Sequence, residues 1–271
     1  MLNRKDGSKS NGLKPVPLAR GMVRLCLALC AVAFGLLAGC STVIPRLDAK
    51  FDAEPLGAPP IAPSPTPPND QLAWRTGSVS SSIVPDSAGR VLRVAPLPSF
   101  TSAPDNRQVF LIAISEPFTT SPVANIRGNV RLRLNGLGIV GFGLRPLQKE
   151  QTLDFIAAVE LGNYLSPASG SVDLIEGFPG SRLGDPFGLS SAGKLSGYIT
   201  GKMIDVNWSI DQASRTLFAS VSGGPPQSVS FPPTSGGVAT TPIQRLEIHF
   251  WMQRPTTETM LFIDNLRAEE Y

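Results

Sequence analysis

Apolar and polar residues alternate in short runs from residue 72 to the end of the chain, and Gly, Pro, Ser, Asn and Asp separate these runs. Alternation with a period of two is typical of strands that bury one face, and the separating residues favour turns. No part of this region has a convincing 3.6-residue apolar period with helix caps, and residues 153–161 are the one stretch whose pattern also fits a helix. The pattern predicts an all-β domain with strands at 78–84, 90–94, 108–115, 129–134, 139–144, 153–161, 171–175, 195–200, 203–210, 216–221, 228–231, 244–252 and 260–267.

Two segments show the alternation most clearly. Residues 203–221 predict a hairpin with a turn at 211–215, and its inward side chains are Ile204, Val206, Trp208, Ile210, Leu217, Ala219 and Val221. Residues 244–252 predict a second strand whose inward side chains are Leu246, Ile248, Phe250 and Met252. The opposite face of that strand then carries Glu247, His249, Trp251 and Gln253.

The amino-terminal part differs in composition from the rest. The chain holds 24 Lys and Arg against 21 Asp and Glu, but residues 1–39 contain six of the basic residues and one acidic residue. The remainder therefore carries 18 basic and 20 acidic residues, a formal net charge of −2, which argues against a nucleic-acid partner. Residues 25–39 form an apolar run of 15 residues. This is shorter than the roughly 20 residues of a membrane-spanning helix and is typical of a secretory signal.

The end of this run, Leu37-Ala38-Gly39-Cys40, resembles the lipobox of bacterial lipoproteins. The resemblance implies that residues 1–39 are removed as a signal peptide and that Cys40 carries a diacylglyceryl group. It also implies acylation, by palmitate or a similar chain, of the new amino terminus and a membrane anchor. Ser41, in place of Asp, resembles lipoproteins that are sorted to the outer membrane. An uncleaved signal anchor is the alternative tether.

We expect a short polar tether at residues 40–50 and the folded domain at residues 51–271. Residues 51–70 include a proline-rich segment with seven prolines between positions 55 and 68. Proline has no amide hydrogen for a sheet ladder, so this segment is expected to run over the surface.

The two ends of the predicted domain resemble concanavalin-like, or laminin-G-like, jelly-roll domains. Phe51-Asp52, followed by Glu54, Pro55 and Gly57, is similar to their first strand. The Trp208 hairpin and residues 261–267 are similar to their closing strands. The resemblance implies an antiparallel jelly-roll β-sandwich whose first and last strands lie side by side.

Residues 136–141 match the pattern G-x-G-x-x-G, which binds dinucleotides when a helix follows it. Here a strand pattern follows instead, ending in Arg145-Pro146. We therefore expect a glycine-rich hairpin or bulge where another part of the backbone passes closely.

Trp251 is the candidate platform for a sugar ring, because apolar sugar faces stack on indole while nearby amides and carboxylates bond the hydroxyl groups. His249, Glu247 and Gln253 share its predicted face, and Asn207 and Asp205 are candidates to extend the same surface. The alternatives are that Trp251 packs under a Gly/Pro-rich segment such as 222–237 and that His249, the chain's only histidine, is a solvated sheet residue.

Catalytic residues are not expected. The Glu-x-Asp-x-x-Glu motif of laminarinase-like jelly-roll hydrolases is missing, and so is a G-x-S-x-G elbow. Asp52, Glu54 and Asp264 could meet if the first and last strands are neighbours, and three carboxylates there would suit a structural calcium ion. The alternative is that they are edge-strand charges or turn caps.

The sequence thus predicts a lipid-anchored protein of the cell envelope with a non-catalytic ligand-binding β-sandwich, and a glycan is the leading class of ligand. A structural or assembly lipoprotein that contacts another envelope protein is the main alternative. A glycan-active hydrolase is the second alternative.

Overall fold

The computed structural model describes residues 43–58, 72–74, 79–87, 89–101, 108–119, 125–148, 151–152, 156–163, 169–176, 190–230 and 243–271. The chain divides into Met1–Thr42 and Val43–Tyr271, and the described residues belong to the second unit. The expected signal peptide and most of the proline-rich segment therefore lie outside the described residues. Within the described part, no helix is long and apolar enough to span a membrane.

The described residues form an antiparallel β-sandwich of two sheets, in agreement with the predicted all-β jelly-roll class. Sheet A has the strand order β14 (Gln227–Ser230), β13 (Thr216–Val221), β12 (Ile204–Asp211), β6 (Ile126–Asn135), β16 (Met260–Glu270), β4 (Gly89–Pro96) and β3 (Val79–Asp86), with β1 (Ile44–Lys50) also paired to β16. Sheet B has the order β11 (Ser190–Ile199), β10 (Ser169–Glu176), β9 (Ala157–Asn163), β7 (Gly138–Gln148), β15 (Arg245–Gln253), β5 (Gln108–Ile114) and β2 (Leu72–Trp74), with β8 (Gln151–Thr152) on β7. A short helix, α2 (Pro98–Thr101), follows β4.

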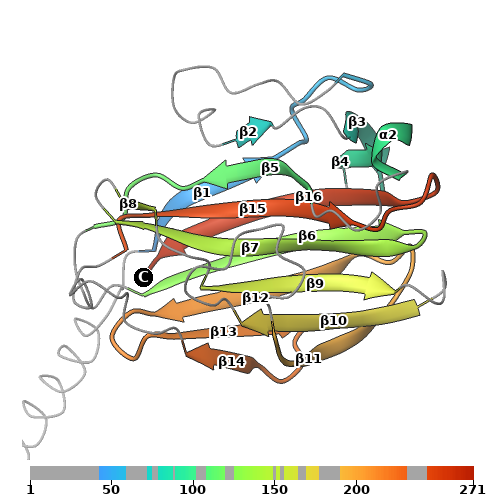
Figure 1. The fold of residues 1–271 in the computed structure, drawn as a ribbon. Helices are drawn as coiled ribbons and strands as arrows, with labels where there is room; N and C mark the ends of the chain where they lie inside the picture. Colours follow the sequence, from blue (N-terminus) through green and yellow to red (C-terminus); the bar gives the residue numbers. More distant parts are fainter. Residues whose placement is uncertain are drawn as a thin grey trace, which may run out of the picture. The chain divides into compact units, whose positions relative to one another are not determined.

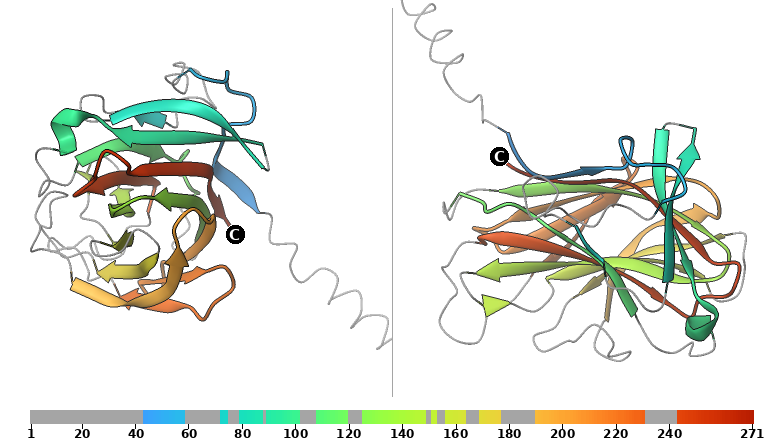
Figure 2. Two further views of the ribbon diagram at one scale, coloured as in Figure 1. Left: turned by 90° about the vertical axis from the view of Figure 1, so that its right-hand side faces the viewer. Right: turned by 90° about the horizontal axis from the view of Figure 1, so that it is seen from above.

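Every strand expected from residue 78 onward overlaps an observed one, and the predicted pairing of the domain's first and last strands is confirmed. The first described strand, β1, runs antiparallel to the last, β16, and lies beside it (Figures 1 and 2). The predicted start of the domain was too late, however. Residues 44–50 form β1 rather than a tether, and Phe51 begins a turn rather than a strand. Leu47 is buried in the core, which holds this strand in place.

The inward faces of both sheets form one hydrophobic core. The predicted inward residues of the 203–221 and 244–252 segments are all buried. Phe250 of β15 lies at the centre of an aromatic group, with its ring centroid 5.8 Å from that of Phe142 and 6.5 Å from that of Phe110. Complete burial of a side chain of this size contributes about 1.5–3 kcal/mol.

The hairpin turn between β12 and β13 is closed by Asp211. Its Oδ1 accepts hydrogen bonds from the backbone amides of Ala213 (2.9 Å) and Ser214 (3.1 Å). The bond from the Ser214 amide is the main reason that the pKa of the Asp211 carboxyl lies below its usual value, because it stabilises the charged form. Arg215 completes the turn in the left-handed region, at φ 55°.

The glycine-rich segment joins the two sheets. Gly136, at φ 80°, follows the end of β6 in sheet A, and Gly138, at φ 131°, is the first residue of β7 in sheet B. A Cβ at position 136 would lie 2.6 Å from the carbonyl oxygen of Glu258. The predicted close backbone approach is therefore confirmed, but the turn crosses between sheets instead of closing a hairpin within one sheet.

Gly128 provides the test of core packing in sheet A. The indole of Trp208 lies directly against it, and a Cβ at this position would overlap both that ring and the carbonyl oxygen of Arg267. We predict that Gly128→Ala lowers the free energy of unfolding by about 1–3 kcal/mol, as overpacking does. Chemical denaturation measures this change. Gly197→Ala is the matched control, because its nearest neighbouring atom, a backbone oxygen, would be 3.7 Å away. Equal stability of the two variants would contradict the packing of Trp208 on Gly128.

Candidate functional site

The four polar and aromatic candidates on β15 share one face, as predicted. Glu247, His249, Trp251 and Gln253 alternate with the core residues of the strand. They are not on an open surface, however. Trp251 is 1% exposed, His249 is 6% exposed, and Gln253 is also buried.

Trp251 has a packing role in the structure. It forms a small hydrophobic cluster with Ala158 and Ile175, and Val109 packs against that cluster. The indole lies over Gly141 of the neighbouring strand, where a Cβ would be 2.9 Å from the ring. The expectation of an exposed indole platform is therefore wrong, because sheet parity identifies the face of a side chain but not what covers that face.

His249 is bound to Glu247 on this covered face. The Nε2 atom of His249 lies 2.7 Å from Oε2 of Glu247, and Ile112 of β5 lies opposite the histidine. Opposite Glu247 lies Arg145 of β7, which supplies a neighbouring positive charge. The alternative of a solvated histidine is wrong as well. The pair is a buried polar contact that keeps the imidazole in one orientation.

Asp205 and Asn207 lie on the other sheet. Both belong to β12 in sheet A, whereas Trp251 belongs to β15 in sheet B, and both point away from the core. They cannot extend the Trp251 surface, so the six predicted ligand-binding residues do not form one site. Asn207 is nevertheless exposed and lines a pocket on sheet A.

The outer face of sheet A is organised by the polar side of β6. This strand presents Arg127, Asn129, Arg131 and Arg133 on alternate positions. The last two are held by acids: Arg131 Nη1 donates to Asp264 Oδ2 (2.7 Å) and Arg133 Nη1 donates to Asp86 Oδ1 (2.8 Å). Asn129 Nδ2 donates to Oδ1 of Asn207 (3.0 Å). Asp205 lies 3.7 Å from Arg131.

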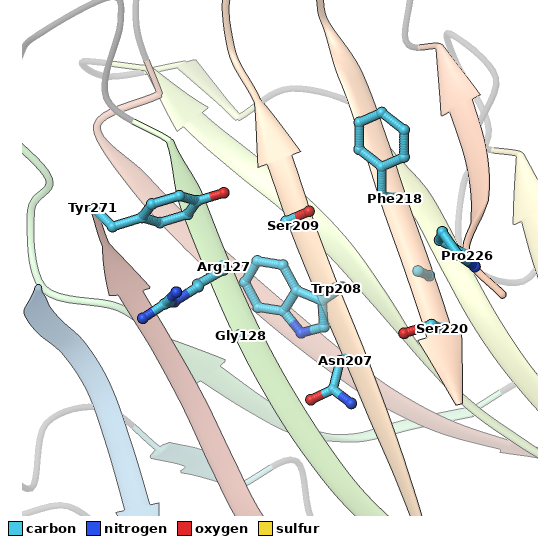
Figure 3. A pocket seen from close by; sticks show the side chains of 10 residues that line it. Arg127, Gly128, Asn207, Trp208, Ser209, Phe218, Ser220, Pro226 and Tyr271 are labelled. Atoms are coloured by element: carbon cyan, nitrogen blue, oxygen red, sulfur yellow. The ribbon is translucent and has the colours of Figure 1, made fainter. Parts of the chain in front are cut away.

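An open pocket with a volume of about 450 Å³ lies where this polar row ends. Its position follows from the strand register, in which Ser209 of β12 is directly opposite Arg127 of β6 on one side and Phe218 of β13 on the other. The small side chain of Ser209 therefore lies between the large side chains of Arg127 and Phe218, and the space over Ser209 forms the pocket. The pocket is lined by Arg127, Gly128, Asn207, Trp208, Ser209, Phe218, Ala219, Ser220, Pro226 and Tyr271 (Figure 3).

Aromatic rings are exposed at both ends of the pocket. Figure 3 shows Tyr271 beside Arg127 at one end and Phe218 near Pro226 at the other, with Ser209 and Asn207 between them and Ser220 on the same strand as Phe218. Phe218 is 39% exposed and Tyr271 is 40% exposed. The guanidinium carbon of Arg127 lies 4.8 Å from the centre of the Tyr271 ring. The pocket thus combines apolar ring faces with hydroxyl, amide and guanidinium groups.

The candidate calcium ligands are not brought together. Asp52 Oδ1 accepts a hydrogen bond from the Arg90 backbone amide (2.9 Å), and Asp264 is engaged by Arg131. Among the described residues, no group of three or more His, Cys, Asp or Glu side chains could hold a metal ion. The alternative interpretation, charges at strand edges and turns, agrees with these contacts.

The pocket uses residues that the sequence analysis did not select. Strand parity contained the signal for Phe218, because Leu217 and Ala219 point inward and the residue between them must point outward. Its exposure next to Ser209 depends on the pairing of β12 with β13 and β6. Arg127 and Tyr271 come together through the pairing of distant strands, which the sequence pattern alone does not specify.

No protein-family description and no curated protein sequence matches the chain. Among solved structures, the chain is similar to an alginate lyase from Pseudomonas aeruginosa, at 13% identity over 73% of this chain and 85% of that one, with a TM-score of 0.41. It is similar to the CBM2 module of an evolved Dit protein of Lactobacillus casei phage J-1, at 9% identity over 84% and 95%, with a TM-score of 0.46. It is also similar to lectin I from Ulex europaeus, at 13% identity over 74% and 92%, with a TM-score of 0.39. No functional conclusion follows from likenesses at this level.

The buried position of Trp251 generates a prediction. Trp251→Ala should lower the free energy of unfolding by about 3–5 kcal/mol, because it leaves a cavity among Ala158, Ile175 and Val109. Phe218→Ala is the control for an exposed aromatic ring and should cost about 1 kcal/mol or less. Urea denaturation compares the two. A Trp251→Ala protein of unchanged stability would show that the indole is not a packing element.

Proposed function

We propose that this chain is a lipid-anchored protein of the bacterial cell envelope that binds a saccharide in the pocket on the outer face of sheet A. The observation that carries the proposal is the row Arg127, Ser209 and Phe218, which leaves a gap between a fixed cation and an exposed ring. The pocket volume of about 450 Å³ falls within the roughly 300–1,000 Å³ that is usual for small-ligand sites.

The two exposed rings support a saccharide ligand. Pyranose rings have apolar faces of C–H groups that pack on aromatic surfaces, and a ring that stays accessible in the free protein is ready for such contact. Phe218 and Tyr271 are both exposed, with 39% and 40% of their surface accessible, and both line this pocket.

The polar lining supports the same class of ligand. Asn207, Ser209 and Ser220 line the pocket with an amide and two hydroxyl groups. Each of these groups can both donate and accept hydrogen bonds, as sugar hydroxyl groups do. Asn129 binds the amide oxygen of Asn207, so the Asn207 side chain is held in one orientation. A held amide loses less conformational entropy when a ligand binds.

Binding without chemical change is better supported at this pocket than hydrolysis. Glycoside hydrolysis uses a pair of carboxylates on the two sides of the bond. The residues that line the pocket include no Asp, Glu or His, and nearby Glu269 is engaged by Arg127 and Arg267. A hydrolase would need its acids elsewhere on the chain.

Contact with another envelope protein is the alternative use of this face. Its supporting observation is that Phe218 and Tyr271 are exposed. A protein partner would cover a wider area than the pocket, because stable protein interfaces bury about 800 Å² on each side. Variants outside the pocket would then weaken binding as strongly as variants inside it.

The anchor is proposed from the sequence alone. Leu37-Ala38-Gly39-Cys40 has the lipobox pattern, and Ser41 favours delivery to the outer membrane. Each buried methylene of an attached acyl chain contributes ~0.8 kcal/mol, so two or more chains hold a protein firmly at a membrane.

The saccharide proposal is tested by binding of the mature domain to an array of neutral and acidic oligosaccharides, followed by calorimetry on those that bind. Phe218→Ala should weaken binding by about tenfold or more, because an aromatic ring that becomes buried against the ligand contributes about 1.4 kcal/mol or more to binding. Ser209→Tyr should weaken binding to a similar degree, because the larger side chain fills the gap between Arg127 and Phe218.

Ile199→Ala is the matched control, since Ile199 is an exposed hydrophobic residue on sheet B. It should bind as the wild type does. The proposal fails if no oligosaccharide binds, or if both pocket variants bind as well as the wild type does.

The anchor is tested separately. Cys40→Ser removes the thiol that would receive the diacylglyceryl group, so the variant should take up no labelled fatty acid and remain an uncleaved precursor. Metabolic labelling with palmitate, followed by membrane fractionation, measures both. Normal labelling of Cys40→Ser would contradict lipidation at this residue.

A further inference from the structure

We infer that Arg127 makes the pocket selective for saccharides that carry an anionic group on the ring, such as a carboxylate or a sulfate. The inference rests on the saccharide-binding role proposed above. It comes from the way in which Arg127 differs from the other arginines on the outer side of β6.

Arg131 and Arg133 use terminal nitrogens in their hydrogen-bonded ion pairs. Arg131 Nη1 donates to Asp264 and Arg133 Nη1 donates to Asp86. Arg127 instead donates from Nε to Oε1 of Glu269. Both of its terminal nitrogens therefore lie outside this hydrogen bond, and two N–H groups in one plane match the two oxygens of a carboxylate.

The acid that binds Arg127 has a second arginine partner. Glu269 is shared, because its Oε2 also lies 2.8 Å from Nη2 of Arg267. Glu270, the next carboxylate along β16, is directed to Arg46 (3.0 Å) and to the backbone amide of Thr119 (3.0 Å). Two guanidinium groups thus share the side-chain carboxylate of Glu269 at this end of the pocket.

Arg127 is also held in place before a ligand arrives. Glu269 binds its Nε, and the Tyr271 ring lies 4.8 Å from the guanidinium carbon. These two contacts fix the plane of the guanidinium group, while 47% of the side chain remains exposed. A cation that is fixed and partly exposed can bind an anion without first losing side-chain freedom.

The register provides room for one sugar ring between this cation and Phe218. Arg127 and Phe218 are each one strand away from Ser209, so their backbones are about 10 Å apart at the usual spacing of 4.7–4.9 Å between strands. A ring that stacks on Phe218 can direct a substituent toward Arg127. An anionic substituent gains the ion pair, whereas a neutral hydroxymethyl group gains at most a hydrogen bond.

The test compares three matched probes by calorimetry: a galacturonic acid oligosaccharide, a sulfated galactose oligosaccharide and the neutral galactose oligosaccharide of the same length. The wild type should bind at least one anionic probe about tenfold or more tightly than the neutral one, and salt should reduce the difference. The tighter anionic probe identifies which group Arg127 binds. Arg127→Gln should bring the affinities for the anionic and neutral probes within about threefold of each other.

Arg267→Gln is the control, because Arg267 also contacts Glu269 but does not line the pocket. It should keep the preference for the anionic probe. Equal affinity of the wild type for all three probes would overturn the inference and leave saccharide binding intact. An Arg267→Gln protein that loses the preference as fully as Arg127→Gln would overturn it too, since the general charge of the region would then be the cause. Failure of all three probes to bind would count against the proposed function itself.

Discussion

The pairing of outward-facing arginines on β6 with acids from other strands is the interaction that orders the outer face of sheet A. Arg131 and Arg133 are two positions apart on one strand, about 7 Å along it, so unpaired guanidinium groups there would repel each other. Asp264 from β16 and Asp86 from β3 remove that repulsion. The order β12, β6, β16 is therefore consistent with the charges on its outer face as well as with the apolar residues on its inner face.

The pocket lies at the Arg127 end of the outward-facing row of β6, where the neighbouring side chains differ from those around Arg131 and Arg133. At Arg127 the neighbours across the strands are Glu269 on one side and Ser209 on the other, and Phe218 follows beyond Ser209. On the inner side, Gly128 lets the Trp208 indole lie flat against the strand. Two adjacent residues of β6 thus have different roles. Gly128 packs against the core residue Trp208, and Arg127 exposes a guanidinium group whose terminal nitrogens lie outside its hydrogen bond to Glu269. The proposed binding role follows from this difference: Arg131 and Arg133 are paired with aspartates, whereas Arg127 has the small Ser209 and the pocket on one side.

The fold could be predicted from the sequence because strand alternation is a local property. The faces of β12, β13 and β15 followed directly from it. Strand β1 was missed because its apolar residues alternate weakly, and its structure depends on pairing with β16, more than 200 residues away. The candidate site was predicted only in part, for a similar reason. Parity showed that Trp251 and Asn207 point away from the core, but it could not show that they belong to different sheets or that Trp251 is covered.

Lipidation at Cys40 would determine where the domain works, and the outer face of sheet A would determine what it binds. The most direct test is whether the saccharide binds on the outer face of sheet A. The mature domain is titrated with an oligosaccharide that binds on the array, and NMR identifies the residues whose signals shift. The Asn207 side-chain amide and the backbone amides of Ser209 and Phe218 should shift, while those of His249 and Trp251 on sheet B should not. Shifts confined to His249 and Trp251 would contradict a binding site on sheet A.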